Sequence, residues 1–209
     1  MTLETDNTQK LTISRMDSAI AILNFWFGDA NDPSGEYGQQ RSVWFRKDPT
    51  FDAEIRQRFL ADYENAAAGH YDSWQTEPRP CLALILLLDQ WPRNLFRHQP
   101  QSFATDPAAR AAAAYAIAHG YERTLLPVER LFLYLPFEHS EDPADQARSV
   151  QYFTALAQAA PELIDTLDYA HRHRDVITRF GRFPHRNAIL GRINTPEEAE
   201  FLTQPGSRF

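Results

Sequence analysis

Hydrophobic residues recur every three or four positions along most of the chain, which is the spacing of amphipathic α-helices. Over residues 17–27, for example, Ile20, Leu23 and Phe27 fall on one face. A helix is predicted over residues 50–68 on the same grounds. Runs that alternate apolar and polar residues, as half-buried strands do, are nearly absent. The pattern therefore predicts an all-α protein.

Several helix starts are marked by a capping residue followed by proline, whose fixed backbone angle suits the first helical position. These pairs are Asp106-Pro107, Asp142-Pro143 and Thr195-Pro196. A further helix, opened by Pro161, is predicted to end at Gly181. The residues expected in line along it are Leu163, Leu167, Ala170, Arg174 and Ile177.

The most apolar predicted helix starts near Cys81, which is followed by seven consecutive apolar residues, Leu82–Leu88. A helix that is apolar all round is buried, so this helix should lie at the centre of the protein. Pro92 limits how far it can run without a kink, and Pro136 is expected to interrupt the apolar helix that starts at Pro127.

About eight helices with short connections are predicted, and no change in composition marks a linker between domains. We therefore expect one compact all-α domain over residues 17–203. Residues 1–16 are expected to form a disordered or loosely ordered tail, and residues 204–209 a frayed end.

Composition and charge disfavour several classes of function. The net charge of −7 opposes binding to nucleic acid and to anionic membranes. No stretch approaches the ~18–20 apolar residues that cross a bilayer, and the first sixteen residues lack the apolar segment of a secretory signal. Cys81 is the only cysteine, which excludes an intrachain disulfide and a cysteine-based zinc site. A cytoplasmic protein is the resulting expectation.

Positive charge is concentrated near the end of this acidic chain. Between His171 and Arg192 there are six arginines and one acid, Asp175, which gives a local charge of +5 without the histidines. The guanidinium fork grips carboxylate or phosphate, so it suits either internal ion pairs or capture of an anion. Two interpretations stay open: a structural ion-pair hub, with acids such as Asp89, Glu138 and Glu141 as partners, or one wall of an anion site.

The loop after Gly181 is predicted to hold polar side chains still. Phe183 precedes Pro184, which excludes helix there and favours an extended backbone. His185, Arg186 and Asn187 then follow between apolar anchors, as a binding site requires.

Asp89 follows the apolar run of the central helix, so it should emerge at the edge of the core. A carboxylate there needs an arginine, and Arg93, Arg182 or Arg186 would serve. Either Asp89 makes a simple ion pair at the helix end, or Asp89 and Gln90 line a pocket.

His139 stands in a short acidic segment, directly after Glu138. A histidine between carboxylates is suited to general base catalysis, or to half of a metal site that His173 or His185 would complete. The spacings HExxH and ExxH, which place metal ligands on one helix face, do not occur.

Three motifs resemble a known bacterial family: LILLLDQWPRNLFR (Leu84–Arg97), FLYLPFEHSED (Phe132–Asp142) and FGRFPHRNAILGR with the following TPEE (Phe180–Glu198). The family is the uncharacterised one named domain of unknown function 924, and the resemblance extends from about Ala19 to Leu202. It implies an irregular α-α superhelix of the tetratricopeptide-repeat-like class. It implies no reaction.

The leading hypothesis is an enclosed polar pocket for a small anionic ligand, a carboxylate or a phosphate, in a protein that is an enzyme if a histidine transfers protons. The ligand-binding candidates are Asp89, Gln90, Arg93, His173, Arg182, Arg186, Asn187 and Arg192. The catalytic candidates are His139, His185 and Glu138. The sequence assigns neither a cofactor nor metal ligands.

Two alternatives stay open beside it. The first, suggested by the implied superhelix, is a scaffold whose concave surface binds a peptide or a protein partner. The other alternative is a metal-dependent hydrolase. Nucleic acid and membrane are not expected as partners, and a homo-oligomer stays open.

Overall fold

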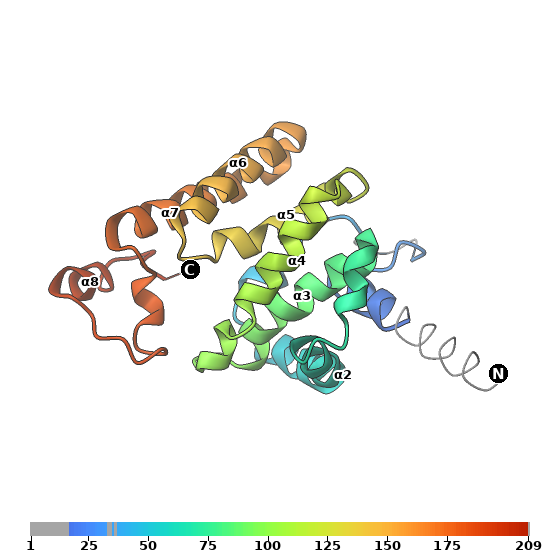
Figure 1. The fold of residues 1–209 in the computed structure, drawn as a ribbon, viewed down its shortest axis with the longest axis horizontal. Helices are drawn as coiled ribbons and strands as arrows, with labels where there is room; N and C mark the ends of the chain where they lie inside the picture. Colours follow the sequence, from blue (N-terminus) through green and yellow to red (C-terminus); the bar gives the residue numbers. More distant parts are fainter. Residues whose placement is uncertain (1–16, 33–34, 36, 209) are drawn as a thin grey trace.

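The apolar helix expected at the centre is the most buried element of the computed structural model, which describes residues 17–32, 35 and 37–208. It is α3 (Pro78–Leu95), in which every residue from Pro80 to Pro92 is buried. The helices that contact it are α2 (Pro49–Ala67), α4 (Asp106–Ala118) and α5 (Pro127–Glu138), drawn around it in Figure 1. The main core therefore forms around α3.

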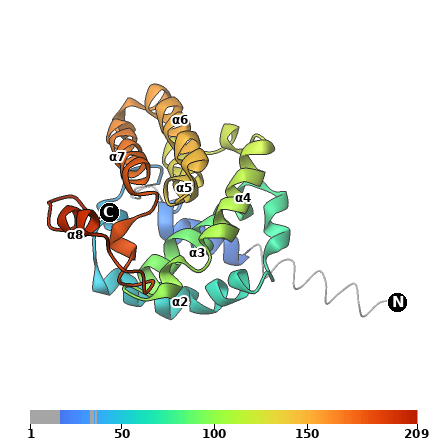
Figure 2. The same cartoon turned by 60° about the vertical axis from the view of Figure 1, so that its left-hand side comes forward.

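The chain continues from α5 into a second group of helices. α6 (Pro143–Ala159) packs on α5, and α7 (Ile164–Phe180) packs on α6. Figure 2 shows α6 and α7 side by side, as does Figure 1. The last helix, α8 (Pro196–Phe201), lies at the opposite end of the molecule from the helix at residues 17–27 (Figure 1).

The all-α class is confirmed. The described part of the chain contains the helix at 17–27, the helices α2 to α8 and short 3-10 turns, with no strand. The finer expectation of a tetratricopeptide-like superhelix stays a prediction. So does the frayed end after residue 203, where the described chain forms turns and Ser207 is buried. The predicted tail at residues 1–16 lies outside the described residues.

The interruption expected at Pro136 was wrong, because α5 continues through this residue to Glu138. α3 ends at Leu95, three residues after Pro92, in agreement with the limit predicted there. Pro92 lies in the last turn of α3, and Pro136 lies in the last turn of α5. Proline there removes a single backbone hydrogen bond, which for Pro92 is the bond to the carbonyl of Leu88. The Thr105 hydroxyl replaces it by donating to that carbonyl oxygen at 2.6 Å.

The predicted cap at Asp106 was also wrong by one position. Thr105 is the N-cap residue of α4, and its hydroxyl is engaged with Leu88 instead of with the first turn. Asp106 is the first helical residue, so its carboxylate is available to other groups. The caps predicted at Asp142 and Thr195 are confirmed, since each side chain accepts a backbone N–H of the helix that follows.

The C-terminal segment has a small hydrophobic core of its own. Val176 and Ile177 of α7 pack with Phe183, and Phe180 and Phe201 cover them. The rings of Phe180 and Phe201 are 5.0 Å apart between centroids. This second core fixes α8 to the end of α7.

Because α3 is the centre of the main core, we expect Leu87→Ala to lower the free energy of unfolding by about 2–5 kcal/mol through lost burial and the cavity left behind. Leu87 is fully buried. Ile20, which was predicted to share the apolar face of Leu23 and Phe27, is instead 51% exposed. Ile20→Ala is therefore the control, with a change below about 0.5 kcal/mol. Chemical denaturation of both variants measures the difference, and equal losses would contradict the central place of α3.

Candidate functional site

A negative charge is buried near the end of α3, where the side chain of Asp89 has no exposed surface. Its carboxylate accepts hydrogen bonds from Gln90 Nε2 at 2.6 Å and from His139 Nδ1 at 2.8 Å. The Arg93 guanidinium lies one turn further on, 3.5 Å from the same carboxylate. Burial alone would raise the pKa of Asp89, but His139 and Arg93 outweigh it and hold this pKa at about 2.

The Asp89 carboxylate fixes the tautomer of His139, the residue that ends α5. An ionised carboxylate can only accept, so the proton of the imidazole is on Nδ1 and Nε2 carries a lone pair. Burial, followed by the charge of Arg93, lowers the pKa of His139. His139 is therefore a neutral imidazole at pH 7, with a basic nitrogen that Asp89 orients.

Two arginines share the carboxylate of Asp106 at the start of α4. Arg93 binds it in two-pronged fashion, at 2.8 and 3.1 Å. Arg186, which comes from the short turn Pro184–Arg186 after α7, reaches it only at 3.4 Å and donates to the backbone oxygen of His139 at 2.9 Å. Asp106 was missed as a site residue because the sequence explained it as a helix cap.

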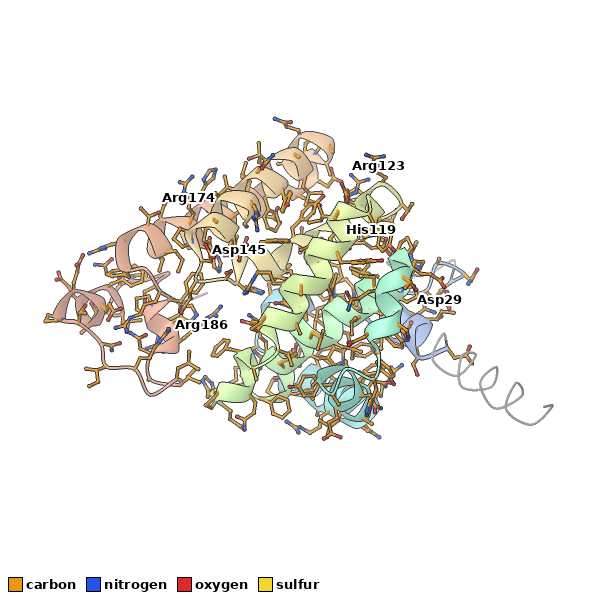
Figure 3. All side chains as sticks on the ribbon, in the orientation of Figure 1. Asp29, His119, Arg123, Asp145, Arg174 and Arg186 are labelled. Atoms are coloured by element: carbon orange, nitrogen blue, oxygen red, sulfur yellow. The ribbon has the colours of Figure 1, made fainter. Side chains whose placement is uncertain are left out.

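Arg186 is buried and makes few hydrogen bonds for a guanidinium. It lies between the C-terminal segment and the central helices (Figure 3), with the rings of Phe103 and Phe183 at 4.5 and 4.7 Å. Of the five N–H donors of an arginine, Arg186 uses two, and its buried Nε has no partner among the described residues. Burial and the neighbouring charge of Arg93 lower the pKa of Arg186 to about 10.

Glu138 and His173 extend the same cluster toward α7. Burial, and secondarily the charge of Asp89, raise the pKa of Glu138 to about 8, so this side chain is protonated at neutral pH. Its Oε1 lies 3.4 Å from His173 Nδ1, which donates to the Tyr169 carbonyl at 2.8 Å. The arginine partner that the ion-pair interpretation gave Glu138 is therefore wrong, since a neutral carboxyl needs no counter-charge.

His173 also corrects the predicted inner face of α7. His173 and Val176 are buried with Ala170 and Ile177, whereas Arg174 has a side chain that is 40% exposed and pairs with Asp175. Burial lowers the pKa of His173 well below its ordinary value. A neutral histidine can take an inner position that a guanidinium without a counter-charge cannot.

The remaining candidates lie in or beside the C-terminal segment and have other partners. Arg182 binds Glu198 in two-pronged fashion at 2.6 and 2.8 Å. Arg192 binds Glu141 in the same way at 2.7 and 2.9 Å. The pKa of His185 falls to about 3 through burial and the charge of Arg186, and the Asn187 amide donates to Asn194 at 2.8 Å. For Arg182 and Arg192 the ion-pair interpretation therefore describes this structure.

Outside this cluster, the described chain has no group arranged for a metal ion, but it does have a hollow. No group of three or more His, Cys, Asp or Glu side chains within residues 17–32, 35 and 37–208 is arranged to hold a metal ion. A hollow of about 410 Å³ lies beside the end of α2, lined mainly by alanines, with Leu84, Leu88, Asp72 and Gln75. None of its lining residues belongs to the cluster around Asp89.

The fold and this cluster define an all-α protein whose C-terminal segment delivers one arginine to a buried acid–histidine cluster. The family described as bacterial protein of unknown function (DUF924) matches residues 22–206, so the chain belongs to that family. This confirms the resemblance found in the three motifs. Among the described helices, none is long and apolar enough to cross a membrane.

One solved structure is similar over most of both chains. It is that of a protein of unknown function from Agrobacterium tumefaciens, which is 41% identical in sequence. The match covers 88% of this chain and 96% of that one, with a TM-score of 0.74. No match was found among curated proteins.

Removing the charge of Asp106 should leave Arg93 and Arg186 without their shared counter-charge. We expect Asp106→Asn to lower the free energy of unfolding by about 3–5 kcal/mol, the usual loss when one member of a buried ion pair is removed. Asp168, whose side chain is 60% exposed beside Arg172, supplies the control. Asp168→Asn should cost less than about 1 kcal/mol, and similar losses for both variants in urea titrations would contradict the role of Asp106.

The protonated state of Glu138 predicts a specific dependence of stability on pH. Between its ordinary pKa of 4.5 and its folded pKa of about 8, the unfolded chain loses a proton that the folded protein keeps. The free energy of unfolding should therefore fall as pH rises through this window, by a few kcal/mol. Glu138→Gln should gain stability relative to the wild-type protein between pH 5 and 8, measured by denaturant titration. A difference that stays constant with pH would show that Glu138 is ionised.

Proposed function

We propose that the cluster around Asp89 binds a small anion, a carboxylate or a phosphate, at Arg186. The observation that carries this proposal is the set of unused donors on a buried guanidinium. Three of the five N–H groups of Arg186 have no hydrogen bond among the described residues. An anion that reached them would supply charge-assisted hydrogen bonds that the protein itself does not make.

The charges around Arg186 favour the same conclusion. Asp106 is engaged closely by Arg93 and only at 3.4 Å by Arg186. The lowered pKa of Arg186 indicates that burial and positive neighbours disfavour its charge, so an added negative charge would relieve it. Solvent reaches the cluster at Arg93, whose side chain is 20% exposed, and at His139, at 14%.

His139 is the candidate catalytic residue of this site. Its neutral imidazole presents Nε2 as a proton acceptor, and the ionised Asp89 would stabilise the imidazolium formed when it takes a proton. Glu138, protonated at neutral pH, is the candidate proton donor. The surroundings raise the pKa of Glu138 and lower the pKa of His139. Neighbouring groups whose pKa values are shifted apart in this way are typical of a catalytic acid and base. The activity that this arrangement supports best is proton transfer to or from a small anionic substrate.

The alternative of a scaffold for a peptide or protein partner has less support. It requires apolar side chains gathered along an exposed groove. Within the part of the chain that the structure describes, the exposed large apolar side chains come from four segments. They are Ile20, Phe45, Ile164 with Tyr169, and Leu190 with Ile193.

Anion binding is tested by titrating the protein with inorganic phosphate, sulfate and acetate in separate calorimetry and thermal-denaturation experiments at pH 7. A ligand at about ten times its Kd should stabilise the wild-type protein by about 1.4 kcal/mol. Arg186→Met should reduce the affinity at least tenfold, because the donors are lost. Arg174→Met is the matched control, since Arg174 is an exposed arginine of α7.

Arg186→Lys separates the charge from the shape of the guanidinium. Lysine keeps the positive charge but lacks the planar fork, so we expect affinity between that of the wild-type protein and that of Arg186→Met. If none of the three anions binds the wild-type protein, or if Arg186→Met binds as tightly as Arg174→Met, the proposed function is wrong.

A further inference from the structure

The residues that carry Arg186 form a compact loop whose two ends lie together. Arg182 Nη2 donates to the backbone oxygen of Ile193 at 2.9 Å and so closes the loop at its base. Inside it, the Leu190 and Arg192 amides donate to the backbone oxygens of Arg186 and Asn187, at 2.9 and 2.8 Å. A compact loop with adjacent ends is an Ω-loop, a form often found at functional sites. We call residues 184–193 the arginine loop.

The arginine loop is joined to the rest of the protein chiefly through polar contacts. Glu141, in the turn between α5 and α6, binds the Arg192 guanidinium at 2.7 and 2.9 Å. The same carboxylate accepts the Phe183 amide at 2.8 Å, just before the loop begins. Arg186 adds its contacts with Asp106 and with the backbone oxygen of His139. Glu141 is therefore the acid that holds the far end of the loop.

Packing of this loop is uneven: Pro184, Arg186 and Asn187 are buried and Ile189 is half-buried, whereas the second half of the loop is open to solvent. Leu190 is 38% exposed and Ile193 is 89% exposed. Gly191 has a φ of +67°, and an added side-chain carbon there would meet no atom within 4 Å. Phe183, which is fully buried, belongs to the small core on α7 and can stay there when the loop moves. Release of the loop would break polar contacts and the stacking of Arg186 and would uncover Pro184 and Asn187, neither of which belongs to either hydrophobic core.

We propose that the arginine loop is the gate of the anion site and that Glu141 is its latch. The proposal rests on the anion binding proposed above. When Arg192 leaves Glu141, the loop carries Arg186 away from Asp106 and His139, which opens the cluster to solvent. Binding of an anion to Arg186 returns the loop and holds it closed. The site is therefore assembled, with Arg186 beside Asp106 and His139, only when the anion enters.

Hydrogen exchange followed by mass spectrometry tests the latch on the full chain at pH 7. In Glu141→Gln, the amides of Leu190 and Arg192 should exchange roughly tenfold faster than in the wild-type protein, while those of α3 stay unchanged. Glu197→Gln is the control, because Glu197 also pairs with an arginine of the C-terminal part, Arg179, through one exposed contact of 2.8 Å. It should leave the loop unchanged. If both variants exchange alike in the loop, Glu141 is not a latch.

Should Glu141→Gln speed exchange throughout the protein, Arg192→Gln tests the same contact from the side of the loop. The gate is tested by repeating the exchange with saturating inorganic phosphate or acetate, in separate runs. The anion should slow loop exchange in the wild-type protein and in Glu141→Gln, but not in Arg186→Met. An anion that binds by calorimetry without slowing loop exchange overturns the gate and leaves anion binding intact. Failure of every anion to bind overturns the proposed function itself. The comparison of Glu141→Gln with Glu197→Gln still shows whether Glu141 holds the loop closed.

Discussion

The buried charge of Asp89 is the constraint around which this structure is arranged. Asp89 lies within α3, the most apolar helix of the protein, where an unpaired carboxylate would cost several kcal/mol. Gln90, His139 and Arg93 each supply a hydrogen bond or an opposite charge, and Arg93 in turn needs Asp106. The ends of α3 and α5 and the start of α4 are thereby brought to one place. Arg186 completes this arrangement from the far end of the chain.

Most of the fold could be predicted because it depends on local signals. The apolar run Leu82–Leu88 identified the central helix, and the caps at Asp142 and Thr195 marked two helix starts. The error at Asp106 has a cause that no local pattern reveals. The carbonyl freed by Pro92 is satisfied by Thr105, a residue of a different helix start, and this leaves Asp106 available to the arginines.

The candidate site could be predicted in part. The motifs containing Asp89, His139 and Arg186 were found as separate polar segments, and the structure brings them together. Which arginine belonged to which acid could not be read from the sequence, because an arginine side chain reaches several turns or loops. Arg182 and Arg192 stand in the same basic and aromatic segment as Arg186. Their guanidinium groups, however, are bound by the carboxylates of Glu198 and Glu141. Only the three-dimensional arrangement leaves Arg186 with unused donors.

The position of Arg186 after α7 has a consequence for how the protein is made. During synthesis, α2 to α5 leave the ribosome first and can pack around α3 while residues 181–208 are still being added. Asp89, Arg93, Asp106 and His139 are then already in place, and the two acids are already paired with Arg93 and His139. Arg186, the arginine of the proposed anion site, arrives last. The newly made protein would therefore pass through a stage that is folded at its centre but unable to hold an anion.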